Sequence, residues 1–139
     1  MMSDSDLRQA LLGTWRLVSS QSEVDGAVVK SLGDNPLGYL VYTPDGHVFV
    51  QMAARERREL FGPSEHGPVL LETTQADSLL GYRGYSGTFE VRDGQVIHHI
   101  EFHVVLRNYG NAETRSVLLE GDRLILGYRT SHIEWQRVH

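Results

Sequence analysis

The sequence predicts a mainly β protein, folded as a single antiparallel barrel of about eight to ten strands. Short runs rich in Val, Ile, Leu, Tyr and Phe recur along the 139 residues. Turn dipeptides such as Asp25-Gly26, Asp93-Gly94 and Gly121-Asp122 separate these runs, which is the pattern of consecutive hairpins. A closed barrel is favoured over an open sandwich because closure removes the unpaired edges of the strands.

Two helices are expected beside these strands. A short N-terminal helix is predicted over 4–12, with Asp4 or Ser5 as its N-cap, and another over 73–83, near the barrel mouth. Residues 53–72 form the longest irregular stretch, which predicts either a solvated loop or a lid over the mouth. The expected strands cover 14–24, 27–32, 38–43, 47–53, 84–92, 95–105, 113–120, 123–129 and 132–138.

Composition narrows the classes of partner. The length favours one domain over 1–139, and the absence of cysteine excludes disulfides and a thiol nucleophile. The formal net charge of −5 disfavours nucleic acid and anionic membranes as partners. No basic segment followed by an apolar run opens the chain, and no run reaches the roughly 18 apolar residues of a membrane helix. We therefore expect a cytoplasmic protein, and no cofactor, because no phosphate-binding loop is present.

The Asp93-Gly94 turn assigns the faces of its two strands. A tight turn here pairs Phe89 with His98 and Tyr85 with Phe102, and paired residues share a face. Simple alternation places this set inside the barrel. His98 is therefore predicted to be an inward-facing histidine among aromatic side chains.

The same register turns a row of polar residues outward. His99, Glu101 and His103 have the i, i+2, i+4 spacing that can bring two histidines to one zinc ion on a strand. An outer face lacks the enclosed pocket that a catalytic metal needs. We therefore expect no metal there, and interpret the row as a solvated or subunit-contacting surface.

Two further hairpins supply the other inward candidates. The Gly121-Asp122 turn places Arg115 on the core face beside Tyr128, where an unpaired guanidinium would cost several kcal/mol. The turn at 44–46 sets Tyr42 opposite Val48. Both faces of 39–52 are apolar, which predicts that a helix or a second subunit covers one of them; a homodimer is therefore an open expectation.

Several motifs together resemble the bacterial and fungal lipocalin-like domain family. They are LLGTWRLVS, GYLVYTPDGHVFVQM, YSGTFEV, VIHHIEF, TRSVLLEGDRLIL and HIEWQRV, in this order over about 11–138. The resemblance implies a small calycin-type barrel with an internal cavity, and an association of some members with secondary metabolism. The Gly13-Thr14-Trp15 start also resembles the G-x-W signature of true lipocalins, which implies that Trp15 fills the closed end of the barrel and that Arg137 packs over it. The stretch HVVLRNYGN at 103–111 departs from the family pattern.

The predicted interior leaves two main hypotheses open. In the first, a cofactor-independent isomerase, cyclase or dehydratase converts a small hydrophobic carbonyl compound, with His98 as acid or base and Arg115 as anchor for an anion or oxyanion. In the second, the barrel is a non-catalytic carrier of such a molecule. Both use the same predicted ligand-binding residues: Tyr42, Tyr85, Phe89, Phe102 and Tyr128. A metal-dependent enzyme using the outward row is a third, less favoured hypothesis.

Overall fold

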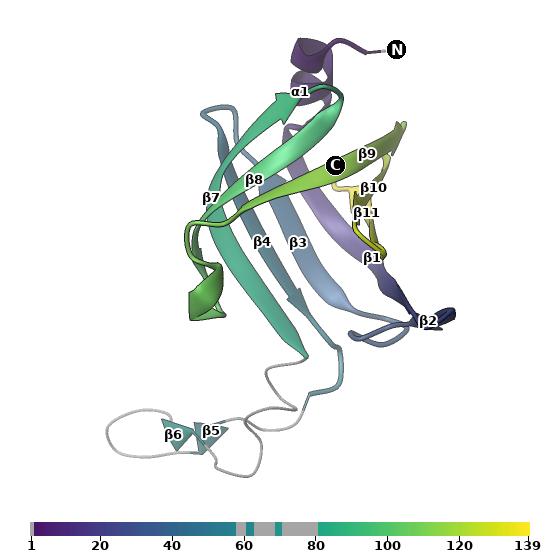
Figure 1. Cartoon of the computed structure of the whole chain (residues 1–139), viewed down its shortest axis with the longest axis vertical. Helices are drawn as coiled ribbons and strands as arrows, with labels where there is room; N and C mark the ends of the chain where they lie inside the picture. The colour runs from purple at the N-terminus through teal and green to yellow at the C-terminus, as the bar shows by residue number, and fades with distance from the viewer. Residues whose placement is uncertain (1, 58–60, 63–68, 71–80) are drawn as a thin grey trace.

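The computed structural model describes residues 2–57, 61–62, 69–70 and 81–139. One helix, α1 (Asp4–Leu11), precedes a sheet in the strand order β11-β10-β9-β8-β7-β4-β3-β1-β2. Pairing of β1 with β11 closes eight of these strands into an antiparallel barrel, and β2 extends beyond it as a hairpin with β1 (Figure 1). The strands are β1 (Gly13–Val24), β2 (Ala27–Val29), β3 (Leu37–Tyr42), β4 (His47–Ala53), β7 (Tyr82–Arg92), β8 (Gln95–His103), β9 (Ala112–Glu120), β10 (Arg123–Tyr128) and β11 (Ser131–Arg137). A separate short pair is formed by β5 (Phe61–Gly62) and β6 (Val69–Leu70).

The predicted barrel is confirmed, and the predicted helices are confirmed in part. Helix α1 begins at the predicted residue and ends one residue before the predicted end. Its N-cap is Ser3 and not Asp4 or Ser5, because the Ser3 hydroxyl, 3.1 Å from the Asp6 backbone nitrogen, accepts the hydrogen bond of that N–H group. Most of the second predicted helix, and most of the predicted lid, lie outside the described residues. The end of that predicted helix is wrong, because Tyr82 and Arg83 belong to β7. A 3₁₀ helix, Leu106–Asn108, follows β8.

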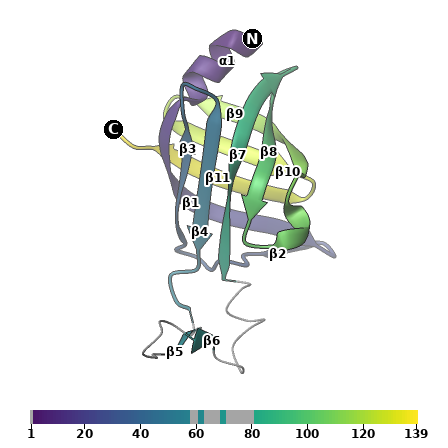
Figure 2. The ribbon, with the colours of Figure 1, turned by 90° about the vertical axis from the view of Figure 1, so that its left-hand side faces the viewer.

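Helix α1 lies across one end of the barrel (Figure 2). Its apolar side buries Leu7 and Leu11 against the strands. The Asp4 carboxylate accepts hydrogen bonds from the backbone N–H groups of Asp93 and Gly94 at the β7–β8 turn, with N···O distances of 2.9 Å in both cases. These contacts fix the helix over this end, which is the closed end of the barrel.

Arg137 and Trp15 complete the closed end, as the sequence predicts. The Arg137 guanidinium lies 4.2 Å from the centroid of the Trp15 ring. It also donates to the carbonyl oxygens of Ala10 and Leu12, at 2.5 and 3.0 Å. Because the last carbonyls of a helix lack partners within the helix, this arginine satisfies them while it covers the indole.

The hairpin register matches the predicted one over most of its length. Phe89 pairs with His98, and Leu119 with Leu124. His98 is 1% exposed, so the predicted inward orientation is confirmed. Alternation therefore identifies the inner face wherever the strands pair without irregularity.

The prediction that Phe102 faces inward is wrong. A β-bulge interrupts the pairing of β7 with β8, so that Tyr85 pairs with His103 and Ser86 with Phe102. One additional residue in a strand reverses the faces beyond it. Phe102 is consequently 55% exposed on the outer surface, and His103 turns inward.

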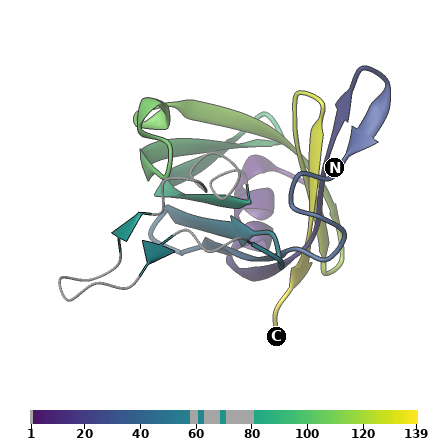
Figure 3. The same ribbon diagram turned by 90° about the horizontal axis from the view of Figure 1, so that it is seen from below.

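The outer face of β3, β4 and the neighbouring strands is apolar. Exposed side chains of Tyr39, Phe49 and Phe102 border a shallow groove of about 560 Å³. The sequence prediction that both faces of 39–52 are apolar is confirmed by this surface. Figure 3 shows the same barrel from the end opposite α1, with the helix behind the strands.

Candidate ligand-binding site

A cavity of about 250 Å³ lies inside the barrel, toward the end away from α1. It is bounded by the second half of β1, the start of β7, the ends of β8 and β10, and the start of β9 and β11. The described residues that line it are Ser20, Ser22, Ser31, Met52, Arg83, Tyr85, His103, Asn108, Glu113, Arg115, Tyr128, Ser131 and Ile133. Polar side chains dominate this wall. The volume is close to the lower limit of ordinary small-molecule sites.

A much smaller chamber of about 20 Å³ adjoins this cavity. Four residues border both the cavity and the chamber: Met52, Tyr85, Arg115 and Ile133. Trp135 borders the chamber but not the cavity. The volume of the chamber is near that needed for one water molecule or one ligand oxygen. Tyr85 and Arg115 therefore stand at the junction of a molecule-sized space and an atom-sized one.

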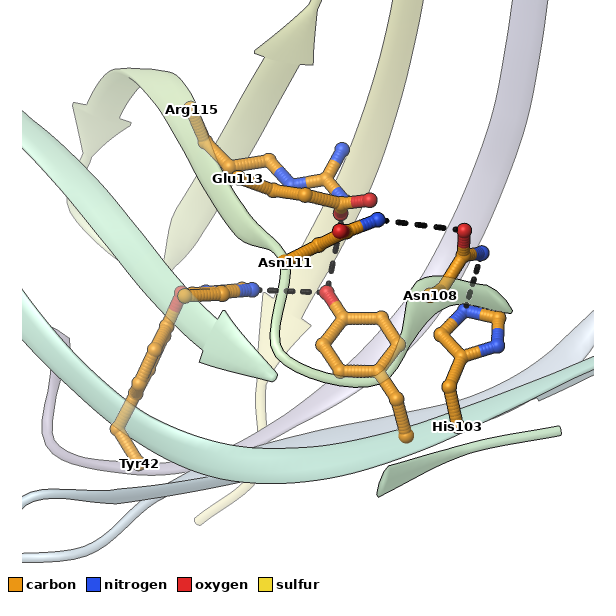
Figure 4. Close-up of polar contacts among 8 residues, drawn as sticks. Tyr42, His103, Asn108, Asn111, Glu113 and Arg115 are labelled. Atoms are coloured by element: carbon orange, nitrogen blue, oxygen red, sulfur yellow. Dashed lines mark hydrogen bonds and ion pairs between the residues drawn. The ribbon is translucent and has the colours of Figure 1, made fainter. Parts of the chain in front are cut away.

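His98 is held between two tyrosines, Tyr42 and Tyr85, of which Tyr42 is labelled in Figure 4. Its Nε2 lies 2.7 Å from the Tyr42 hydroxyl oxygen, and its Nδ1 lies 2.7 Å from that of Tyr85. Burial, followed by the charges of Arg115 and His99, lowers the pKa of His98 to about 3. The imidazole is therefore neutral near neutral pH, with one nitrogen donating and the other accepting.

Both tyrosines keep their protons. Burial, with a contribution from Tyr85, raises the pKa of Tyr42 well above its ordinary value. Burial also raises the pKa of Tyr85, although the positive charge of Arg115 partly opposes this. Each hydroxyl is consequently a neutral group that can both donate and accept a hydrogen bond.

Arg115 meets the carboxylate that its predicted inward position demands. One guanidinium nitrogen lies 2.5 Å from Glu113 Oε2 and 3.5 Å from the Tyr85 hydroxyl. The guanidinium carbon lies 4.9 Å from the centroid of the Tyr128 ring, so the predicted neighbourhood of these two residues is confirmed. Burial lowers the pKa of Arg115, but its electrostatic interactions with Tyr85 and Glu113 more than offset this, and its pKa is raised overall. The sequence analysis did not select Glu113, although its i, i+2 spacing from Arg115 places both on one face.

His103 is a second histidine at the site, and the sequence analysis placed it on the outside. Its ring lies parallel to that of Tyr85, with centroids 5.4 Å apart. The Val105 backbone N–H donates to its Nδ1 at 2.8 Å, and Asn108 lies 3.5 Å from its Nε2. Its pKa is lowered, mainly by burial. The ring therefore supports one side of Tyr85 at the cavity wall.

The five residues predicted to bind ligand divide into three groups. Tyr85 and Tyr128 line the described cavity. Tyr42 and Phe89 pack together toward the closed end, with ring centroids 4.7 Å apart, and are not among its described lining residues. Phe102 lies outside, for the reason given above. Of the two predicted catalytic residues, Arg115 borders both spaces and His98 borders the chamber.

The bulge also separates the residues of the row His99, Glu101 and His103, which the sequence analysis weighed as a metal site. His99 stays on the outer surface, where its Nε2 lies 2.8 Å from a carboxylate oxygen of Glu90. His103 turns to the interior, so the two histidines no longer share a face. Within the described ranges, no group of three or more His, Asp or Glu side chains is placed to hold a metal ion.

An eight-stranded antiparallel barrel that is closed at one end by a helix and contains a cavity with a largely polar wall belongs to a class of barrels suited to binding small molecules. The sequence profile of the lipocalin-like domain family matches residues 12–137, and the chain belongs to this family. No curated protein matches the chain. No helix among the described residues is long and apolar enough to cross a membrane.

Several solved structures share the fold, and two of them are similar over nearly the whole chain. One is an uncharacterized protein from Bacteroides eggerthii DSM 20697, with a TM-score of 0.50 and 14% identity, over 92% of this chain and 99% of that one. The other is a lipocalin-like protein from Bacteroides uniformis ATCC 8492, with a TM-score of 0.50 and 13% identity, over 92% and 98%. At this identity the likeness concerns the fold alone.

Proposed function

We propose that the barrel binds one small molecule in its cavity of about 250 Å³, beside Tyr85 and Arg115. The observation that carries the proposal is the convergence of these two hydrogen-bonding side chains on an interior space. Because a pocket with a few fixed polar groups orients its ligand through them, the ligand must carry an oxygen that faces Tyr85.

The wall also supports a ligand with an apolar part. Met52, Ile133 and the ring of Tyr128 provide apolar surface beside the serines and Asn108. A compact carbonyl compound with a hydrophobic body fits this combination better than a pure hydrocarbon. This combination supports the small hydrophobic carbonyl compound that the sequence predicts as ligand.

Mass spectrometry of the purified protein under native conditions, followed by solvent extraction, tests the proposal. We expect a bound small molecule whose mass disappears in Ser20→Phe, where the new ring fills the cavity. Thr114→Phe is the matched control, because Thr114 is exposed on β9 and the cavity stays open. Equal occupancy in both variants would place the ligand outside the barrel and contradict the proposal.

A cofactor-independent isomerase, cyclase or dehydratase is the second candidate function. A chain of hydrogen bonds from Tyr42 through His98 to Tyr85 favours it, because such a chain can move a proton. Arg115, whose pKa is raised, keeps its proton and stays a fixed positive charge beside Tyr85. In this reaction Arg115 anchors the substrate oxygen and His98 exchanges protons through Tyr85, since Tyr85 already occupies its Nδ1. The extracted molecule, returned to fresh protein, would then emerge rearranged or dehydrated; unchanged recovery favours the carrier.

Three other expectations remain proposals. A homodimer through the outer apolar groove is tested by sedimentation velocity at two protein concentrations. A cytoplasmic location is tested by cell fractionation. Independence from a cofactor is tested by activity or binding after exhaustive dialysis against a chelator.

A further inference from the structure

We propose that Tyr42 and His98 orient the Tyr85 hydroxyl as a fixed hydrogen-bond donor for one neutral acceptor oxygen, the carbonyl of a ketone or aldehyde. This inference rests on the proposed binding function and adds to it the group that meets the ligand's carbonyl oxygen, the preference for a neutral oxygen over a carboxylate, and the direction of the hydrogen bonds. It makes Tyr85 the residue that meets the ligand, and Tyr42 a positioning residue.

The direction of the chain follows from Tyr42. This side chain is 1% exposed, and among the described residues its hydroxyl has one hydrogen-bond partner, Nε2 of His98. If Nε2 carried the proton, the Tyr42 O–H would be a buried donor without an acceptor. Leaving a buried donor unpaired costs more than the hydrogen bond itself contributes. Tyr42 therefore donates, and Nε2 accepts.

The other end of the imidazole is then fixed. A neutral histidine with Nε2 as acceptor carries its proton on Nδ1, so Nδ1 donates to the Tyr85 oxygen at 2.7 Å. Arg115 reaches the same oxygen from 3.5 Å. Because Tyr85 accepts from both, its own proton has no acceptor among these partners and is free to meet a molecule in the adjoining spaces.

A second unpaired donor belongs to the same chamber. Trp135 is 1% exposed and borders the small chamber, and its Nε1 has no hydrogen-bond partner among the described residues. The chamber thus has Tyr85, Arg115 and Trp135 in its wall, all of which can donate, while its remaining wall is largely apolar. A space of about 20 Å³ with this wall suits one oxygen atom of a ligand.

The charge at the site selects a neutral oxygen over a carboxylate. Glu113 already neutralises Arg115 at 2.5 Å, and the side chains of this pair are 17% and 10% exposed. A carboxylate ligand would bring a second negative charge next to Glu113 in a poorly hydrated place, where like charges repel strongly. A carbonyl accepts the same hydrogen bonds without this repulsion.

The first measurement concerns the histidine itself and needs no ligand. Two-bond proton–nitrogen correlation spectra of the ¹⁵N-labelled protein near neutral pH identify which ring nitrogen of His98 is protonated. We expect the Nδ1–H form in the wild type, and a loss of that preference in Tyr42→Phe. A wild-type His98 in the Nε2–H form would overturn the proposed direction, whether or not any molecule binds.

The second measurement compares three probes of similar shape: acetophenone, α-methylstyrene and benzoate. We expect acetophenone to bind roughly two- to tenfold more tightly than α-methylstyrene, and benzoate to bind least well. Tyr85→Phe should abolish the difference between the first two probes. Tyr42→Phe should reduce it, although Tyr42 is not among the lining residues; a purely structural role would weaken all probes equally.

The indole signals give a local control. The chain has two tryptophans, and the Nε1–H of Trp15 already donates to the Leu11 carbonyl at 2.9 Å. Acetophenone should shift the Trp135 indole resonance and leave that of Trp15 in place. Equal binding of acetophenone and α-methylstyrene would overturn the donor role of Tyr85. Absence of any probe binding, with His98 in the Nδ1–H form, would count against the binding function and the carbonyl site but not against the hydrogen-bond direction.

Discussion

His103 stacks on Tyr85 inside the barrel, with ring planes 4° from parallel and centroids 5.4 Å apart. The two residues are cross-strand partners because β8 contains one more residue than regular pairing with β7 requires. Regular pairing would put Phe102 against Tyr85 and turn His103 to the outside. The bulge therefore exchanges a phenyl ring for an imidazole at the cavity wall and makes this part of the interior polar.

Gly87 makes this bulge possible, which gives the first prediction. A Cβ at residue 87 would lie 1.9 Å from the His99 carbonyl oxygen, so Gly87→Ala must displace backbone. We expect a loss of several kcal/mol in the free energy of unfolding, measured by urea denaturation. Gly110→Ala is the control: its Cβ would meet open space, and its positive φ of 79° should cost only about 1 kcal/mol. Equal losses in the two variants would contradict a role for the close approach.

The sequence predicted the fold because hairpin turns and alternation act locally. Asp93-Gly94 sets the register of its hairpin as far as Gly87, and this was enough to place His98 inside. Beyond Gly87 the prediction of Phe102 failed, because a bulge depends on how closely two backbones approach, which alternation does not encode. A glycine between alternating strand residues is the signal that could have indicated it.

The sequence predicted which residues form the candidate site better than it predicted the contacts between them. A buried Arg115 requires a carboxylate partner, and Glu113 on the same strand face is that partner. The tyrosine partners of His98 come from β3 and β7, and their contacts depend on barrel closure and rotamers. A sequence pattern does not specify such contacts between distant segments.

Buried His98 should make stability depend on pH. The pKa of His98 is lowered to about 3 in the folded protein from an ordinary value of 6.5. Between these two pH values the unfolded chain binds a proton on His98, whereas the folded chain does not. The free energy of unfolding should therefore fall as the pH is lowered from about 6.5 toward 3, by at most about 1.4 kcal/mol per pH unit from this residue. Urea midpoints of the wild type and His98→Gln, measured across this range, should diverge at neutral pH and converge in acid.

An exposed histidine provides the control for that experiment. His132→Gln should keep the wild-type pH dependence, because His132 is exposed on β11. If the unfolding free energy of His98→Gln changed with pH as steeply as that of the wild type, the pKa of His98 could not be lowered in the folded protein.

Arg137 should stabilise the closed end of the barrel. Arg137→Ala removes the cover of Trp15 and leaves the carbonyls of Ala10 and Leu12 without these partners. We expect a loss of about 2–4 kcal/mol in unfolding free energy. Arg16→Ala removes a cation–π contact with exposed Tyr39 at 5.8 Å and should cost less than about 1 kcal/mol. A comparable loss in the two variants would show that helix docking does not depend on Arg137.

Replacing Glu113 should change which ligand the cavity prefers. Glu113→Gln removes the negative charge beside Arg115 and leaves the guanidinium free to pair with an anion. We expect the free energy of unfolding to fall by about 2 kcal/mol and the affinity for benzoate to rise above that for acetophenone. Isothermal titration with both probes measures this exchange.

Glu120→Gln is the control that tests whether the change in probe preference requires removal of a carboxylate inside the barrel. Glu120 pairs with Arg123 at 3.2 Å, and both side chains are well exposed. Losing this pair should leave the order of the probes unchanged and alter stability little, because water screens surface ion pairs. If Glu113→Gln still favoured acetophenone, the charge of Arg115 would not reach the bound probe, and Glu113 could not be the residue that excludes carboxylates.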